Sequence, residues 1–125
     1  MIFSIDFDSE EALYTQLCNQ IINCIAIEEM KEGDTLPSVR QLAELVGVNM
    51  HTVNKAYAVL REEGLIRLDR RRGAVIAINV DKMRAAENVT DEMRVIIAKA
   101  LCKNLTPEEI HEIVDKIICE YLGGD

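Results

Sequence analysis

Apolar residues recur along much of the chain at steps of three and four, the spacing that places them on one face of an α-helix. The first segment with this spacing has its apolar positions at Leu13, Leu17, Ile21, Cys24 and Ile25. Asp8 or Ser9 is a suitable N-cap, and the two glutamates that follow suit the positive end of a helix dipole. We therefore expect a first helix that begins near Ser9 and ends before Gly33.

Two shorter segments with helical spacing follow. The first opens at Pro37 and Ser38 and ends at Gly47, since glycine tolerates the left-handed backbone at a helix C-terminus. The second is capped by Asn49 and ends at Gly64. Its inward positions are Val53, Ala56, Tyr57 and Leu60. Two short helices joined by a tight glycine turn are typical of a helix-turn-helix.

After Gly64 the helical spacing gives way to two β-prone runs, residues 65–68 and 74–78. The stretch between them reads Asp-Arg-Arg-Arg-Gly, which is typical of a hairpin with an exposed basic tip. A hairpin directly after a helix-turn-helix is a wing. Two strands alone are marginally stable, so we expect them to pack on the helices.

From about residue 79 the helical spacing returns, first over residues 90–103. The last helix opens at Thr106 with a capping box, has Pro107 at its first position and runs to Gly123 and Gly124. Both helices carry wide apolar faces that two helices cannot bury alone, so we expect contacts with the winged domain and with another chain. The expected fold is mainly α with a small β-hairpin wing: a winged helix-turn-helix over residues 1–78 and a two-helix tail over residues 79–125.

The formal net charge of −8 argues at first against binding to nucleic acid, because Lys and Arg dominate phosphate contacts. The charges are unevenly distributed, however. Residues 1–35 carry one base and eight acids, a net charge of −7, whereas residues 36–76 carry seven bases and four acids, a net charge of +3. The helix-turn-helix and wing therefore form a basic island in an acidic chain.

The outward face of the second helix of the helix-turn-helix carries short polar and basic side chains that can approach a DNA groove. They are Asn49, His51, Thr52, Asn54 and Lys55. Asparagine can bind adenine through two hydrogen bonds, and lysine or threonine can bind phosphate or guanine. An ordinary solvated helix face is the alternative, but Arg40 and the basic wing favour DNA.

No nucleophile and base, glycine-rich phosphate loop or pair of carboxylates predicts an enzyme, and no cofactor or metal site is expected. His111 shares a helix face with Glu108 and Asp115, but a solvated histidine is the better interpretation. The cysteines occupy apolar helical positions, so we expect buried free thiols, with a redox-sensing thiol as the alternative. They are Cys18, Cys24, Cys102 and Cys119.

No apolar run reaches the roughly 20 residues of a membrane span, and the chain opens with acidic residues where a signal peptide carries basic ones. We therefore expect a cytoplasmic protein with no membrane partner.

Four motifs together resemble the GntR family of bacterial transcription regulators. They are Leu-Tyr-x-Gln in the first helix, Gly-Asp-x-Leu-Pro-Ser-x-Arg-x-Leu-Ala at the second, Gly-Val-x-x-x-Thr-Val at the third and Glu-Gly-Leu-Ile entering the wing. The resemblance covers about residues 12–78. The short tail and the stretch Asn-x-His-Thr-Val-x-Lys-Ala-Tyr are similar to the YtrA-type subfamily.

The resemblance implies a homodimer, paired through the C-terminal helices, that binds a two-fold operator in double-stranded DNA. It places Arg40 and the polar residues of the third helix at DNA, Ser38 at the DNA backbone and Gly73 at the wing tip. It also associates the chain with transporter operons.

The chain departs from the family pattern at two places. Met50 and Asn54 stand where many members carry arginine. The wing has Arg71, Arg72 and Gly73 where members usually have Gly-x-Gly-Thr, so we expect the two arginines to hold phosphates.

The leading hypothesis is therefore a homodimeric, sequence-specific regulator of transcription that acts as a repressor. A rival hypothesis is a winged-helix module for protein association, which would use the acidic N-terminal region and the tail and would not bind DNA. A third hypothesis adds to the DNA role a small-molecule effector, held between the tail and the winged domain.

Overall fold

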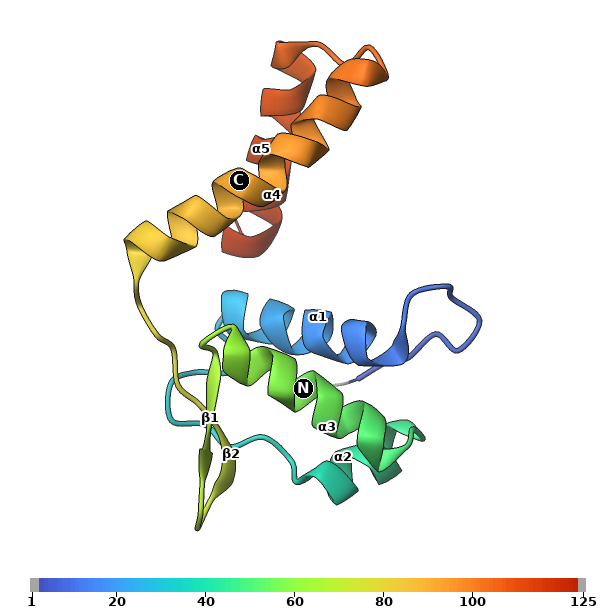
Figure 1. Ribbon diagram of the computed structural model, residues 1–125, viewed down its shortest axis with the longest axis vertical. Helices are drawn as coiled ribbons and strands as arrows, with labels where there is room; N and C mark the ends of the chain where they lie inside the picture. The colour runs from blue at the N-terminus through green and yellow to red at the C-terminus, as the bar shows by residue number, and fades with distance from the viewer. Residues whose placement is uncertain (1–2, 124–125) are drawn as a thin grey trace. The chain divides into compact units, whose positions relative to one another are not determined.

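Five α-helices and one β-hairpin make up the part of the chain that the computed structural model describes, residues 3–123 (Figure 1). The chain divides into two units, Met1–Asn79 and Val80–Asp125. The first contains α1 (Leu13–Ala26), α2 (Val39–Val46), α3 (Met50–Glu62), β1 (Ile66–Asp69) and β2 (Gly73–Ile76), and the second contains α4 (Lys82–Cys102) and α5 (Pro107–Leu122). The predicted fold class, mainly α with a small hairpin, is confirmed.

Helix α1 begins at Leu13, so the predicted start near Ser9 is wrong. The backbone N–H of Asp8 donates to Asp6 Oδ1 (3.0 Å), and that of Glu11 donates to Ser9 Oγ (3.1 Å). Such short side chains offer the backbone local hydrogen bonds that compete with a helix. Asp6 and Ser9 therefore form turns instead of capping α1.

The loop before α1 is closed by Gln16, the one buried polar side chain among the described residues. Its Nε2 donates to the carbonyl oxygens of Asp6 and Glu11, both at 3.0 Å, and its Oε1 accepts from the Asp6 N–H at 2.9 Å. A buried amide must be hydrogen-bonded, and these three bonds satisfy it. The extended N-terminal segment is thereby fixed against α1.

The helix-turn-helix is capped as the sequence predicts. Ser38 caps α2 through a capping box with Gln41, Gly47 ends α2 with the left-handed φ of 75°, and Asn49 caps α3. The predicted inward face of α3 is buried and packs against α1, α2 and the hairpin in one core. The fully buried large side chains of this core are Leu17, Ile21, Leu42, Val53, Leu60, Val75 and Ile76.

The wing pairs β1 with β2 in antiparallel register, from Ile66 opposite Ile76 to Asp69 opposite Gly73. The loop before α2 pairs with the other edge of β2, an arrangement that the sequence did not predict. The Leu36 N–H donates to the carbonyl oxygen of Ala74 at 2.8 Å. The pairing continues from the Gly33 N–H to the carbonyl oxygen of Ile76 and from the Ile76 N–H to that of Asp34, both also at 2.8 Å. Backbone hydrogen bonds therefore tie the wing to the loop that leads into the helix-turn-helix.

Helix α4 begins at Lys82, eight residues before the predicted start at Thr90. Asp81 caps it through a 3.1 Å hydrogen bond from the Arg84 N–H to Oδ1. The added turns hold good helix formers with little apolar periodicity, which is why the spacing of apolar residues did not reveal them. Helix α5 is capped by Thr106 as predicted and ends at Gly123, whereas Gly124 lies outside the described residues.

No described residue of α4 or α5 is buried within the chain. The large apolar side chains that stay open on the two helices include Val95, Ile96, Ile113, Ile117 and Ile118. An exposed apolar surface of this extent indicates a partner.

The four cysteines are free thiols that differ in burial. Cys18 and Cys24 are buried as predicted, and burial raises the pKa of both thiols. Cys102 and Cys119 are exposed, so the prediction of burial is wrong for them in the single chain. Their helices have no core of their own, and an apolar helical position is buried only if something packs on it.

Candidate nucleic-acid interface

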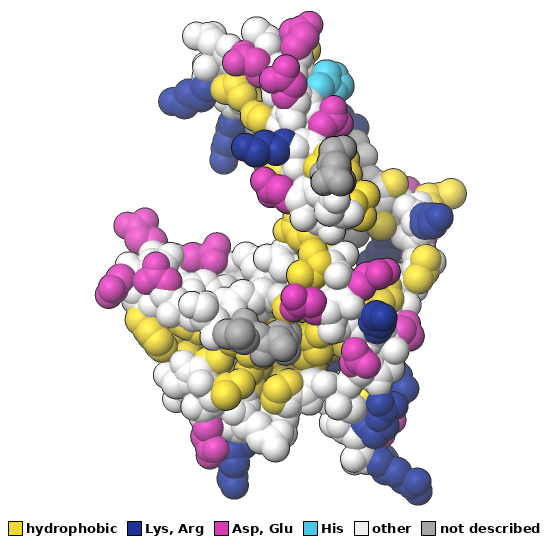
Figure 2. Space-filling view, turned by 180° about the vertical axis from the view of Figure 1, so that it is seen from behind, with side chains coloured by type: hydrophobic (Ala, Val, Ile, Leu, Met, Phe, Trp, Pro, Cys, Tyr) yellow, Lys and Arg dark blue, Asp and Glu magenta, His cyan; other side chains and the backbone are white. Residues whose placement is uncertain are grey.

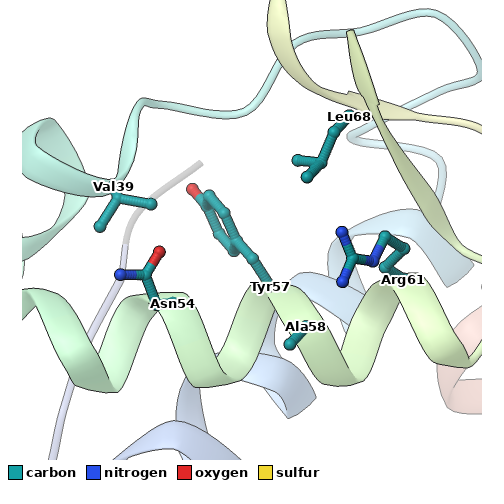
Figure 3. A pocket seen from close by; sticks show the side chains of 6 residues that line it. All are labelled: Val39, Asn54, Tyr57, Ala58, Arg61 and Leu68. Carbon is teal, nitrogen blue, oxygen red and sulfur yellow. The ribbon is translucent and has the colours of Figure 1, made fainter.

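Helix α3 presents its polar side chains on two different sides. Asn54, Ala58 and Arg61 follow one another at steps of four and three residues, which places them on one side of the helix. Together with Val39 of α2, Tyr57 and Leu68 of β1 they line a hollow of about 170 Å³, the wing-side hollow (Figure 3). Its apolar lining includes Val39, Ala58 and Leu68, and Asn54 and Arg61 bring an amide and a guanidinium to it.

The other side of α3 faces α1. His51, Thr52 and Lys55 line a second, more open hollow of about 340 Å³ with Leu13 and Tyr14, the α1-side hollow. The residues predicted for the third helix are therefore divided between two surfaces: Asn54 lies on one, and His51, Thr52 and Lys55 lie on the other.

Lys55 is held by an aromatic ring in the α1-side hollow. Its Nζ lies 4.1 Å from the centroid of the Tyr14 ring, within the range of a cation–π interaction. The aromatic face fixes the ammonium beside His51 and Thr52 while leaving Lys55 exposed. This arrangement suits a phosphate group, which binds a localised positive charge and nearby hydrogen-bond donors.

Tyr57 connects α3 to the start of α2. Its hydroxyl donates to the carbonyl oxygen of Pro37 at 2.7 Å, and burial strongly raises its pKa, so the hydroxyl stays protonated as a donor. Figure 3 shows the ring with Val39 and Asn54 on one side of it and Leu68 and Arg61 on the other. This bond ties α3 to the segment that leads into α2.

Two of the predicted residues also act as caps. Asn49 Oδ1 accepts from the His51 N–H at 2.8 Å, which holds the amide in place and leaves its NH₂ group free to donate to a ligand. Ser38 Oγ accepts from the Gln41 N–H at 3.1 Å, and its hydroxyl hydrogen stays available to a phosphate. Arg40, in the first turn of α2, is exposed.

The wing tip is organised by Asp69. Its Oδ1 accepts from the backbone N–H groups of Arg71 (2.8 Å) and Arg72 (3.1 Å), and its Oδ2 lies 3.4 Å from Nη1 of Arg67. The hydrogen bond from Arg71 lowers the pKa of Asp69 most, followed by the bond from Arg72 and the guanidinium of Arg67. Gly73, with φ of 79°, completes the turn in a conformation that favours glycine.

The two predicted wing arginines differ in their surroundings. The guanidinium of Arg72 donates through Nη2 to the carbonyl oxygen of Gly33, whereas that of Arg71 has no hydrogen-bond or ion-pair partner within residues 3–123. Arg71 is therefore the freer of the two to meet a phosphate.

The wing turn should respond to acid. Because folding lowers the pKa of Asp69, its two hydrogen bonds stabilise the turn above about pH 4 and are lost as the pH falls through the lowered pKa. We expect the amide signals of Arg71 and Arg72, followed by NMR from pH 7 to pH 2, to share one midpoint below that of an ordinary aspartate. The Asp69→Asn variant, which keeps an acceptor oxygen but does not titrate there, should lose this transition. A midpoint at or above pH 4 would contradict the assignment.

Several residues of these surfaces were not among the predicted contacts, and three of them bear on the site. Arg61 and Leu68 line the wing-side hollow, and Tyr14 lies under Lys55. The position of Arg61 was available from the sequence, because it follows Asn54 by seven residues, about two helical turns. Those of Leu68 and Tyr14 depend on the tertiary packing of β1 and α1 against α3.

Charge is separated within the first unit. Figure 2 shows dark-blue side chains over the wing and magenta ones over the loop that precedes α1. The wing contributes Arg67, Arg70, Arg71 and Arg72, and the loop contributes Asp6, Asp8, Glu10 and Glu11. A negatively charged ligand is therefore attracted to the wing and repelled by the loop.

The described residues hold no group of three His, Cys, Asp or Glu side chains placed to bind a metal ion. None of the described helices combines the length and the apolarity that a membrane crossing requires.

The comparisons with known proteins agree with this geometry. The family model for bacterial regulatory proteins of the gntR family matches residues 13–76, which hold α1, the helix-turn-helix and the wing. The chain is similar to the HTH-type transcriptional repressor YtrA of Bacillus subtilis, with 32% identity over 98% of this chain and 97% of that protein.

Two solved structures are informative. YtrA from Sulfolobus acidocaldarius, a GntR-family transcription factor, is 43% identical with a TM-score of 0.69, and the match covers 82% of this chain and 99% of that one. AraR(DBD) in complex with operator ORE1 is 27% identical with a TM-score of 0.50, over 61% of this chain and 95% of that one. A protein with a similar winged domain therefore binds operator DNA.

Proposed function

The chain belongs to the GntR family of bacterial regulatory proteins and is a DNA-binding transcriptional regulator, and from this premise we propose that it binds a two-fold operator as a homodimer. The family and the relatives are regulators of transcription, not enzymes. One observation carries the proposal: exposed hydrogen-bonding groups of α3 and an arginine-rich wing occupy one unit, while the other unit leaves its apolar faces open.

The proposed DNA contacts are Ser38, Arg40, Asn49, His51, Thr52, Asn54, Lys55, Arg71, Arg72 and Gly73. Three of these residues already make a side-chain hydrogen bond within the protein. They suit phosphate, because each still has a hydrogen-bond donor that is free. This holds for Ser38, Asn49 and Arg72, whose guanidinium has five N–H donors and uses one of its nitrogens for Gly33. Phosphate contacts of this kind fix the register of α3 in the groove.

Pairing of two chains through α4 and α5 would supply the two-fold symmetry. A two-fold interface uses the same patch on both subunits, and the open apolar faces of the tail can serve as such a patch. The paired chains would present two α3 helices about 34 Å apart along the duplex, one turn of B-DNA.

The sign of regulation that we propose is repression, in keeping with the repressor from Bacillus subtilis. Control of a transporter operon and a small-molecule effector stay predictions, as does the cytoplasmic location.

The proposal is tested by fluorescence-anisotropy titration of two duplexes, one from upstream of the chain's own gene and one of random sequence, at about 50 and 200 mM salt. Tight binding to the upstream duplex alone, with a steep salt dependence, is the expected result. Weak, equal and salt-insensitive binding to both would instead favour a winged-helix module for protein association.

Arg40→Ala and Lys55→Ala should each weaken operator binding by about 1–3 kcal/mol and make the salt dependence less steep by about one phosphate contact. The physical reason is the loss of one exposed charge from α2 or from the α1-side hollow. Lys103→Ala is the matched control, since it removes an exposed charge from the turn between α4 and α5. If all three variants bind alike, the assignment of α3 to DNA is wrong.

A further inference from the structure

We propose that the wing-side surface of α3 selects A·T base pairs, with the Asn54 amide on adenine and with Met50 and Ala58 against thymine methyl groups. The inference rests on the proposed function and names what the same site would recognise. It starts from two exposed side chains of α3, Met50 and Asn54, neither of which is the arginine or lysine that pairs with guanine.

Asn54 has the free hydrogen-bonding edge that adenine requires. Its side chain is exposed, and neither its oxygen nor its NH₂ group is bonded within residues 3–123. The neighbouring Tyr57 hydroxyl does not compete for it, because that hydroxyl donates to Pro37. Adenine offers an N7 acceptor and an N6 donor in the major groove, which complement the amide pair, whereas guanine offers two acceptors.

Asn49, the N-cap of α3, lacks this freedom. Its oxygen caps α3 by accepting from the His51 N–H at 2.8 Å, so turning the amide toward a base would break the cap. An N-cap contributes about 1 kcal/mol to stability. The adenine contact therefore belongs to Asn54.

Apolar side chains flank Asn54 on the same side of the helix. Met50 lies four residues before it with 44% of its surface exposed, and Ala58 lies four residues after it and is also exposed. Each is about 6 Å from Asn54 along the helix axis. That distance is close to two base-pair steps of 3.4 Å. The apolar group on a base edge in the major groove is the C5 methyl of thymine.

Basic side chains are absent from this part of α3. Lys55, about 100° around the helix from Asn54, is held by Tyr14 on the side that faces α1, and Arg61 lies seven residues beyond Asn54, near the end of the helix. N-terminal residues of a recognition helix contact bases, so the usual arginine or lysine pairing with guanine has no donor at the base-reading turns of this side. Leu68 extends the apolar surface, since 59% of it is exposed at the rim of the wing-side hollow.

The test begins with selection of duplexes from a random-sequence pool by the full chain, which supplies the DNA probe. Each A·T pair of the selected site is then replaced by G·C, and each thymine by uracil. At the A·T pair that Asn54 contacts, replacement by G·C should lower the affinity of the wild-type chain about ten- to a hundredfold. The same replacement should lower the affinity of Asn54→Ala less than about twofold. Replacing one contacted thymine by uracil removes its methyl group and should lower the affinity of the wild-type chain about fourfold. At one such thymine, Met50→Ala should bind the thymine and uracil duplexes with equal affinity.

Lys55→Ala serves as the control, because a lost phosphate contact weakens binding to all duplexes alike and leaves the ratio between A·T and G·C duplexes unchanged. Circular dichroism establishes that each variant is folded. If the pool yields a preferred site but Asn54→Ala shows the same G·C penalties as the wild type, the inference is wrong and the proposed function stands. If the pool yields no preferred site, the proposed function fails and the inference fails with it.

Discussion

Ile117→Asp is expected to convert the protein from a dimer into monomers and to lower its affinity for a two-fold operator by about a hundredfold or more. Ile117 lies on α5 with 47% of its surface exposed, beside Ile113 and Ile118. A carboxylate at the centre of an apolar interface would be buried without a partner, which opposes association. Without the dimer, the second half-site is no longer bound at the high effective concentration that linkage provides.

Sedimentation velocity measures the association state, and anisotropy measures the affinity for duplexes with one or two half-sites. The variant should bind a single half-site as tightly as one wild-type winged unit does, because the mutation leaves residues 3–79 unchanged. Cys119→Asp is the matched control: it places the same carboxylate on α5, about 160° around the helix from Ile117. A wild-type chain that sediments as a monomer, or an Ile117→Asp chain that stays dimeric, would refute the assignment of the tail.

Local interactions made much of the winged unit predictable. Ser38, Asn49 and Thr106 cap helices through bonds to residues two or three positions away, and Gly47 ends α2 by its own backbone conformation. Such signals are written in a few consecutive residues. The same reasoning failed at Ser9, where an equally good capping residue forms a turn instead because the buried Gln16 holds the preceding loop in place.

Interactions between distant residues were not predictable. Pairing of the loop before α2 with β2 joins residues about 40 positions apart, and neither segment signals the other. The division of the α3 surface depends on Tyr14 of α1 and Leu68 of β1, which lie far from it in the sequence. Residue types on α3 therefore indicated DNA, but only the packing around the helix showed that its polar side chains are divided between two surfaces.

The tail shows a further limit of sequence patterns. The apolar spacing of α5 was correct, yet it does not state what covers the face. Cys102 and Cys119 were expected to be buried on the same reasoning and are exposed in the chain by itself. A periodic pattern gives the direction in which side chains point, and burial requires a second surface.

Leu60→Ala is expected to lower the free energy of unfolding of the winged unit by about 2–5 kcal/mol. Leu60 is 0% exposed and lies in the core with Leu17, Ile21 and Leu42, so the substitution leaves a cavity that the surrounding helices can fill only in part. Native domains are stable by only about 5–15 kcal/mol, and a loss of this size removes a large share.

Urea denaturation followed by circular dichroism measures the effect, which should appear as a lower midpoint at an unchanged slope. Leu45→Ala is the matched control, because it makes the same substitution on α2 at a side chain that is 68% exposed, where we expect less than about 0.5 kcal/mol. Equal losses in the two variants would mean that Leu60 is not in the core. A large loss at Leu60 alone would also predict weaker DNA binding on warming, since Leu60 is one of the core side chains that hold α3 against α1 and α2.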